Sequence, residues 1–189
     1  MTAVKIIPSM PTLHHIDDII QLFDAEFAGQ ENTRLIRGAD EPWYLPADSN
    51  CRYHQVVFAH GFYASALHEI AHWCIAGKER RQQVDYGYWY EPDGRNVAQQ
   101  LAFAAVEAKP QALEWILAKA CGFRFVVSLD NLSGEAGDWQ PFKQAVVDAV
   151  AGYRQHGLPP RALQLQQVLA RFYRQDANWH NYTFGLAEL

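Results

Sequence analysis

The residues with the clearest chemical potential are His68, Glu69 and His72, which form a His-Glu-x-x-His motif. Apolar residues recur at helical spacing over residues 62–76, so the motif is predicted to lie within a helix. Four residues of a helix bring the two imidazoles to one face, about 6 Å apart along the axis. Two neutral imidazoles placed in this way can bind one divalent metal ion. The motif therefore predicts a metal site, with Glu69 near enough to act as a base or to hold a water molecule.

A third protein ligand is expected from another element, because residues 73–77 after the motif contain no further histidine. The candidates are two carboxylates on the next long helix, Glu107 and Glu114. Glu107 follows the apolar run 103–106, where a carboxylate is unfavourable unless it is paired or bound to a cation. Glu114 has a lysine nearby and could face solvent. We therefore expect Glu107 to complete the metal site; the alternative is a surface glutamate paired with a lysine or an arginine.

Two histidines and one glutamate with open coordination positions fit two kinds of enzyme. With zinc, this is the hydrolase arrangement, in which the metal lowers the pKa of a bound water and Glu69 accepts its proton. With ferrous iron, it is the two-histidine-one-carboxylate set that leaves positions for dioxygen and substrate. The ligand types do not separate zinc from iron. A structural metal, or a motif without any enzymatic role, also stays open.

Other residues near the motif could bind a substrate. Lys78, Arg80 and Arg81 follow the helix and could dock an acidic partner, although basic residues at a helix C-terminus also complement its dipole. Aromatic rings could line a pocket for an aliphatic amine or pack in the core. The aromatic candidates are Tyr63, Trp73, Tyr86, Tyr88, Trp89 and Tyr90. The polar candidates are Asp85, Asp93 and Asp130, which could orient a histidine ligand, and His60, expected mainly in a turn.

The elements that must position these residues are mostly helices. We expect helices at 12–28, 62–76, 97–120, 139–156 and 161–175, the third of them bent or split in two at Pro110. Short strands are expected at 55–59 and 125–128, a strand or an aromatic loop at 84–90, and short extended pieces with turns over 33–46. Helices outnumber the strands and do not alternate regularly with them. The pattern predicts an α+β fold, a single helix-rich domain over residues 1–189 with a small sheet and a zincin-like metal-binding helix.

Composition excludes several classes of protein. The 189 residues are 49% hydrophobic and 20% charged, which is typical of a globular chain with one core. The longest apolar run, residues 101–106, is far shorter than the roughly 20 residues that span a bilayer, and no secretory signal is visible. Three scattered cysteines indicate a reducing, cytoplasmic location rather than a disulfide framework. A net charge of −5 argues against direct binding of nucleic acid.

Longer blocks of the sequence resemble the elongation factor P hydroxylase family of bacteria. The likeness runs in order over roughly residues 20–175. It is carried by the blocks 32–38, 41–47, 57–66, 68–78, 84–90, 92–95, 106–113 and 130–132. Blocks of this length are far more specific than the His-Glu-x-x-His motif alone.

The resemblance implies an enzyme that uses dioxygen to hydroxylate a lysine of translation elongation factor P after that lysine has received a β-lysyl group. It implies a metal-dependent monooxygenase whose ligands match His68, His72 and Glu107, with Fe(II) as the expected metal and zinc as the other option. Elongation factor P is then the expected partner of the basic residues after the motif. The alternative function is a zinc metallopeptidase of the HExxH plus Glu type, with Glu69 as its general base.

Overall fold

The computed structural model describes residues 13–87, 96–128 and 139–189. Its helices are α1 (Ile16–Phe27), α2 (Tyr63–Ile75), α3 (Val97–Cys121), α4 (Gln140–His156) and α5 (Pro160–Phe172). Its strands are β1 (Thr33–Arg37), β2 (Trp43–Leu45) and β3 (His54–Phe58). The expected helix-rich α+β fold with a small sheet is confirmed, whereas the zincin-like character of α2 stays a prediction. Within the described ranges, no helix combines the length and the apolar character needed to cross a membrane.

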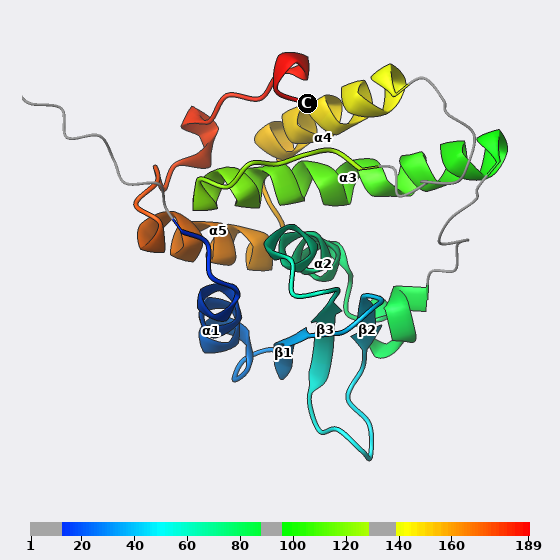
Figure 1. Cartoon of the computed structure of the whole chain (residues 1–189), viewed down its shortest axis with the longest axis vertical. Helices are drawn as coiled ribbons and strands as arrows, with labels where there is room; N and C mark the ends of the chain where they lie inside the picture. The colour runs from blue at the N-terminus through cyan, green and yellow to red at the C-terminus, as the bar shows by residue number, and fades with distance from the viewer. Residues whose placement is uncertain (1–12, 88–95, 129–138) are drawn as a thin grey trace, which may run out of the picture.

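The elements lie in layers, as Figure 1 shows. Helix α4 lies above α3, α5 and α2 lie beneath α3, and α1 and the sheet lie below them. Helix α3 packs against α2, α4 and α5, so it is the central element of the helical part. One hydrophobic core joins side chains from the helices and the sheet, including Phe23, Phe58, Leu67 and Ile116.

The sheet has the strand order β1-β3-β2, with β1 parallel and β2 antiparallel to the central strand β3. Its buried positions alternate along the strands, for example Thr33 and Leu35 in β1 and Val56 and Phe58 in β3. This period of two is what a sheet with one face on the core requires. The strand expected at 55–59 and the extended pieces expected over 33–46 are thereby confirmed.

A tight turn leads from β3 into α2. His60 and Gly61 both have positive φ angles, 53° and 67°, which reverse the chain within two residues. The hydroxyl of Ser65 in the first turn of α2 accepts a hydrogen bond from the amide of Ala59, at 2.9 Å. These contacts fix the start of α2 to the end of the central strand, and with it the position of the motif. His60 is exposed and forms part of this turn, which is the role that the sequence favoured for it.

Helix α3 runs unbroken through Pro110, so the expected option of two separate helices is wrong. Its start is stabilised by a capping box between Asn96 and Gln99, and its end by Gly122 in the left-handed conformation, with φ 65°. Packing on three neighbouring helices offsets the hydrogen bond that the proline removes.

The strand expected at 125–128 and the strand option for 84–90 are absent from the described residues. Residues 125–128 pair with no strand; instead the Gln111 side chain accepts a hydrogen bond from the Ser128 amide and donates one to its carbonyl. Residues 84–87 form a 3-10 turn in which Asp85 and Tyr86 have positive φ angles, so the strand option is wrong there. Residues 88–90 lie outside the described residues.

Arg161 of α5 holds the C-terminal end of α2. Its Nη2 donates to the carbonyl oxygens of Trp73, Cys74 and Ala76, at 2.8, 3.2 and 2.7 Å. Its guanidinium also lies over the Trp73 ring, 4.6 Å from the centroid. The last carbonyls of a helix lack intrahelical partners, so this arginine satisfies groups that would otherwise be desolvated without a hydrogen bond.

We expect Arg161→Met to lower the free energy of unfolding by about 2 kcal/mol, because the three carbonyls lose a charged donor while the apolar stem is kept. Urea denaturation measures this difference. Arg171→Met on the exposed side of the same helix is the matched control and is expected to unfold like the wild type. Equal midpoints for the two variants would show that the Arg161 contacts do not stabilise α2.

Candidate metal centre

Helices α2 and α3 bring together the three residues that the sequence indicated as metal ligands. His68 and His72 lie one turn apart on α2, with their Nε2 atoms 3.1 Å apart. The carboxylate of Glu107 comes from α3: Oε2 lies 3.5 Å from His68 Nε2, and Oε1 lies 3.3 Å from His72 Nε2. One ligand atom from each residue can be chosen so that all lie within 4.8 Å of one another. The three side chains therefore form a group that could hold a metal ion.

The surroundings of Glu107 fit a bound cation. The residue is 1% exposed, and its Oε2 atom has no hydrogen-bond partner among the described residues. A buried carboxylate oxygen without a partner is unfavourable, and a divalent cation would satisfy it. Two imidazole nitrogens and one carboxylate oxygen are a donor set that zinc and ferrous iron both accept.

The same side chains attract one another electrostatically. Burial alone would raise the pKa of Glu107, but the neighbouring His72 and His68 outweigh it and hold this pKa below its usual value. Burial alone would lower the pKa of His68, but its hydrogen bond to Glu114 and the nearby carboxylates raise that pKa well above its usual value. The histidines and carboxylates thus form one interdependent cluster.

Glu114, the other carboxylate considered as a ligand, lies beside the centre in a role that the sequence did not indicate. The suggestion that it could face solvent is wrong: it is only 7% exposed, and its Oε2 lies 2.8 Å from His68 Nδ1. The hydrogen bond places a proton on Nδ1 and leaves the Nε2 lone pair of His68 for the metal position. Glu114 follows Glu107 by seven residues, about two helical turns, so both project from one face of α3. That spacing was the signal available in the sequence.

Glu69 lies on α2 between the two histidines in sequence and is partly exposed. Burial raises the pKa of its carboxyl group, and the nearby charges of His68 and His72 oppose the rise. A carboxyl group with a raised pKa beside a metal site is suited to accepting and releasing a proton. Its role as a base stays a prediction.

A cavity of about 720 Å³ opens at His72 and Glu107. One wall consists of residues 75–80 after the motif, together with Tyr86, and the other of residues 105–110 of α3 apart from Ala108. Its size is typical of a site for a small ligand or a single side chain. Lys78 and Arg80, two of the residues expected to bind substrate, line this cavity. The Arg80 side chain also donates to the carbonyl of Tyr86, at 3.0 Å.

Trp73 and Arg81 do not line the cavity, contrary to the expected substrate-binding role. Trp73 is fully buried on the opposite face of α2, against the rings of Phe23 and Phe27. Arg81 forms an ion pair with Glu31 at 2.7 Å, and its guanidinium lies 5.8 Å from the centroid of the Trp73 ring. Both side chains are engaged in packing the end of α2.

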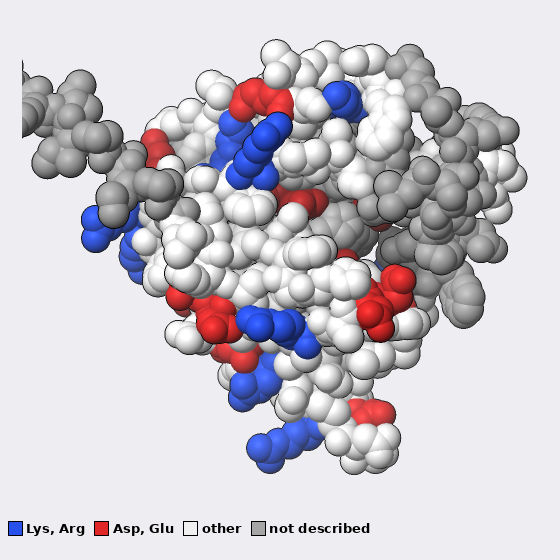
Figure 2. Space-filling view, in the orientation of Figure 1, with Lys and Arg blue, Asp and Glu red and all other residues white. Residues whose placement is uncertain are grey.

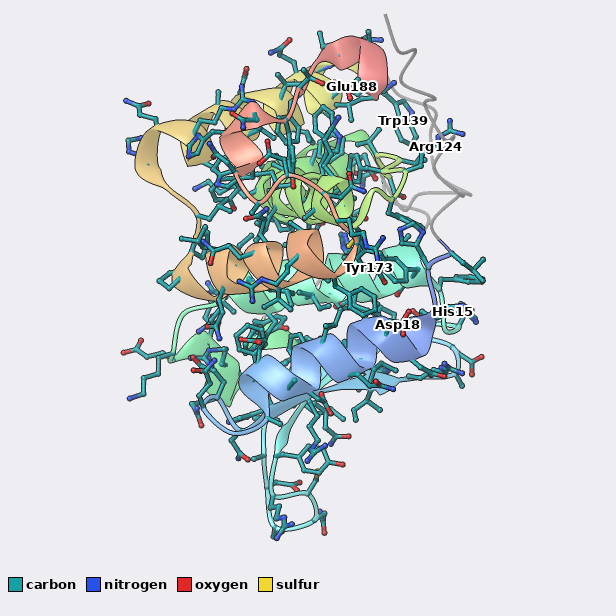
Figure 3. All side chains as sticks on the ribbon, turned by 90° about the vertical axis from the view of Figure 1, so that its left-hand side faces the viewer. His15, Asp18, Arg124, Trp139, Tyr173 and Glu188 are labelled. Carbon is teal, nitrogen blue, oxygen red and sulfur yellow. The ribbon has the colours of Figure 1, made fainter. Side chains whose placement is uncertain are left out.

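Tyr63 is also placed in the core, at the start of α2. Its hydroxyl donates to the hydroxyl of Tyr173, at 3.0 Å, and contacts the Cys121 sulfur at 3.4 Å. Figure 3 shows Tyr173 at the end of α5, facing the start of α1 where His15 and Asp18 lie. Tyr63 therefore joins the ends of helices, and Lys78 and Arg80 remain as the expected substrate-binding residues that reach the cavity.

The other candidates have structural partners or lie outside the described residues. Asp85 Oδ1 accepts a hydrogen bond from the amide of Tyr44, at 2.7 Å, so it holds the 84–87 turn against β2 rather than orienting a histidine. The Tyr86 ring stacks on Tyr44, with centroids 4.3 Å apart, and its buried hydroxyl has no hydrogen-bond partner in the described ranges. Those outside the described residues are Tyr88, Trp89, Tyr90, Asp93 and Asp130.

Two histidines one turn apart on α2 and a carboxylate from α3 form a group of the two-histidine-one-carboxylate type, which could hold a metal ion. Comparison with known proteins identifies the family. Residues 22–184 match the family model described as elongation factor P hydroxylase. The elongation factor P lysine hydroxylase of Haemophilus influenzae is 58% identical over 163 residues, which cover 86% of this chain and 92% of that protein. The chain belongs to the elongation factor P hydroxylase family, and the resemblance seen in the sequence is confirmed.

Proposed function

We propose that this protein is a metal-dependent monooxygenase that hydroxylates a lysine side chain of translation elongation factor P. The observation that carries the proposal is the His68–His72–Glu107 group at the end of a cavity of side-chain size. The Haemophilus influenzae relative is named for the same reaction on a lysine. Because elongation factors act in translation, the proposed location is the cytoplasm.

His68, His72 and Glu107 would hold the metal, for which we propose Fe(II). Insertion of oxygen into an unactivated carbon–hydrogen bond requires a metal that can change its oxidation state, and zinc cannot do so. A bound ferrous ion would supply the activation of dioxygen. The protein would hold His68 in the correct tautomer through Glu114, and Glu69 would accept or release the proton that the reaction requires. The apolar side chains of Ile75, Val106 and Pro110 on the cavity walls would limit the access of water.

The test is the mass of elongation factor P after incubation with iron-loaded protein, dioxygen and a reductant. A gain of one oxygen on the lysine is expected. His68→Ala protein and zinc-loaded wild type are the controls, and neither is expected to produce the gain. Peptide cleavage by the zinc-loaded protein, without oxygen transfer by the iron-loaded protein, would favour the metallopeptidase instead.

Basic side chains surround the cavity and are proposed to meet acidic groups of elongation factor P. Lys78 and Arg80 lie on one wall, and Lys109 lies on the opposite wall. On the face of the molecule in Figure 2, positive and negative side chains are interspersed in small groups rather than gathered by sign. Local pairs across the cavity, rather than the field of the whole protein, are therefore the proposed basis of docking.

We expect the double variant Lys78→Glu/Lys109→Glu to raise KM for elongation factor P about tenfold without changing kcat, since docking charges act on the encounter rather than on the chemical step. Steady-state kinetics at low salt measure the two constants. Arg124→Glu/Arg171→Glu changes the net charge equally at exposed positions after α3 and at the end of α5, and should leave KM unchanged. The same KM in both double variants would show that Lys78 and Lys109 do not dock elongation factor P.

A further inference from the structure

Pro110 interrupts the backbone hydrogen-bond ladder in the interior of helix α3. Pro110 lies inside the 25-residue helix and has no N–H group, so the carbonyl of Val106, four residues earlier, receives no helical hydrogen bond from it. The ring of a helical proline also crowds that carbonyl and turns it away from the axis. The Val106 carbonyl therefore lacks its usual helical donor in the middle of a long helix.

This acceptor lies on the wall of the cavity. A helical carbonyl points along the axis toward the residue four positions later, so the Val106 oxygen lies on the strip of helix surface between Val106 and Pro110. Both of these residues line the cavity. The next residue in the chain is Glu107, whose carboxylate belongs to the proposed metal group. The free acceptor and the reactive end of the cavity are therefore one residue apart along α3.

The surroundings favour a donor that arrives with the substrate. Ala105, Val106 and Pro110 make this part of the wall apolar, although Ala105 and Val106 are exposed to solvent. A substrate that covers them would exclude water from the carbonyl, and a hydrogen bond in such apolar surroundings is stronger than one exposed to water. The charged side chains that line the same cavity are Lys78, Glu79, Arg80, Glu107 and Lys109. Four of these residues are exposed: Lys78, Glu79, Arg80 and Lys109. A lysine side chain entering between them carries an N–H donor at its nitrogen, whether that nitrogen is a free ammonium group or an acylated amide.

We propose that the Val106 carbonyl, freed by Pro110, accepts a hydrogen bond from the side-chain nitrogen of the substrate lysine. This contact positions the lysine so that a given carbon faces the His68–His72–Glu107 group. The inference rests on the proposed function, since it presumes a lysine substrate in this cavity. It assigns a positioning role to a residue that carries no reactive side chain.

The test uses Pro110→Ala, which restores an N–H group at position 110 and returns the Val106 carbonyl to the helical ladder. This variant is expected to melt at or above the wild-type temperature, because a proline inside a helix is destabilising. Pro141→Ala is the matched control. Pro141 is exposed in the first turn of α4, where an added N–H gains no helical partner.

Two substrate probes separate the hydrogen bond from a change in cavity shape. Each is elongation factor P with a cysteine at the modified position, alkylated to give either an aminoethyl or a trimethylaminoethyl side chain; only the first has an N–H donor. Dissociation constants are measured with metal-loaded protein in the absence of dioxygen. We expect Pro110→Ala to weaken binding of the aminoethyl probe about tenfold, and to leave binding of the trimethylated probe as in the wild type.

An unchanged dissociation constant for the aminoethyl probe in Pro110→Ala would overturn the inference, as would equal weakening of both probes. Neither result would affect hydroxylation by the wild type, which is assayed separately on unaltered elongation factor P. If the wild type neither hydroxylates that protein nor binds the aminoethyl probe, the proposed function fails and this inference fails with it.

Discussion

Replacing Glu107 with glutamine is expected to weaken metal binding by more than about 100-fold, beyond the range typical of a residue that only supports a ligand. The substitution keeps the size of the side chain but removes the negative charge that the two histidines face in a buried position. Turnover of elongation factor P should be lost in parallel. Metal content after dialysis, together with the mass assay, measures both effects.

Glu79→Gln is the control for the effect of Glu107 on metal binding. It removes a carboxylate from the opposite wall of the same cavity, but Glu79 is exposed and lies outside the group of possible ligands. Its metal affinity is expected to equal that of the wild type. A different pattern, in which Glu107→Gln lowers the melting temperature of the metal-free protein but binds metal normally, would reduce Glu107 to a structural partner of the histidines.

The second large effect is expected at Glu114. Replacement by leucine should weaken metal binding by up to about 100-fold, and replacement by glutamine by about tenfold. Leucine removes the acceptor that keeps the proton of His68 on Nδ1. Glutamine can still accept from Nδ1–H but carries no charge, or it can donate to Nδ1 and force the proton onto Nε2, where it blocks the metal position. We therefore expect metal affinity to be lowest in the leucine variant, intermediate in the glutamine variant and highest in the wild type.

Metal titration of the three Glu114 proteins gives this order directly. Glu31→Gln serves as control, because it also breaks a partly buried contact of a carboxylate, that with Arg81, without touching the ligands. If the Glu114 variants lost stability but bound metal as tightly as the wild type, the hydrogen bond to His68 would have no influence on the ligand. The role of Glu114 would then be confined to packing.

The sequence alone was sufficient for the parts of the centre that depend on local pattern. The spacing of His68 and His72, and the helical period around them, placed both imidazoles on one face of α2. The apolar run before Glu107 identified the carboxylate that the structure places opposite the histidines. These inferences depend on residues within one or two helical turns, for which geometry is fixed by the backbone.

The sequence was misleading where burial depends on distant elements. Helix α3 is covered by α2, α4 and α5, so a polar residue near Glu114 in the sequence does not show that this side of the helix faces solvent. Lys119 made Glu114 look exposed, but its ammonium group lies 5.8 Å from the centroid of the Trp115 ring and pairs with Glu188 near the C-terminus. The nitrogen thus reaches the surface while the residues around it stay buried.

The predictions for Trp73 and for residues 125–128 were wrong for the same physical reason. An aromatic residue next to a metal ligand on α2 can face the site or the core, and only the packing of α1 and α5 decides between them. The run 125–128 has strand-like residues, but no strand edge is beside it, and the Gln111 side chain takes the backbone hydrogen bonds instead.

The origin of the ligands on two helices has a thermodynamic consequence. His72 and Glu107 are 35 positions apart in the chain, so the unfolded protein retains at most the local histidine pair and binds metal weakly. Preferential binding to the folded state stabilises it by about 1.4 kcal/mol for every tenfold rise in free metal above the dissociation constant. Melting temperatures recorded across a metal series therefore rank the affinities of iron, zinc and other cations on one scale, independently of any substrate.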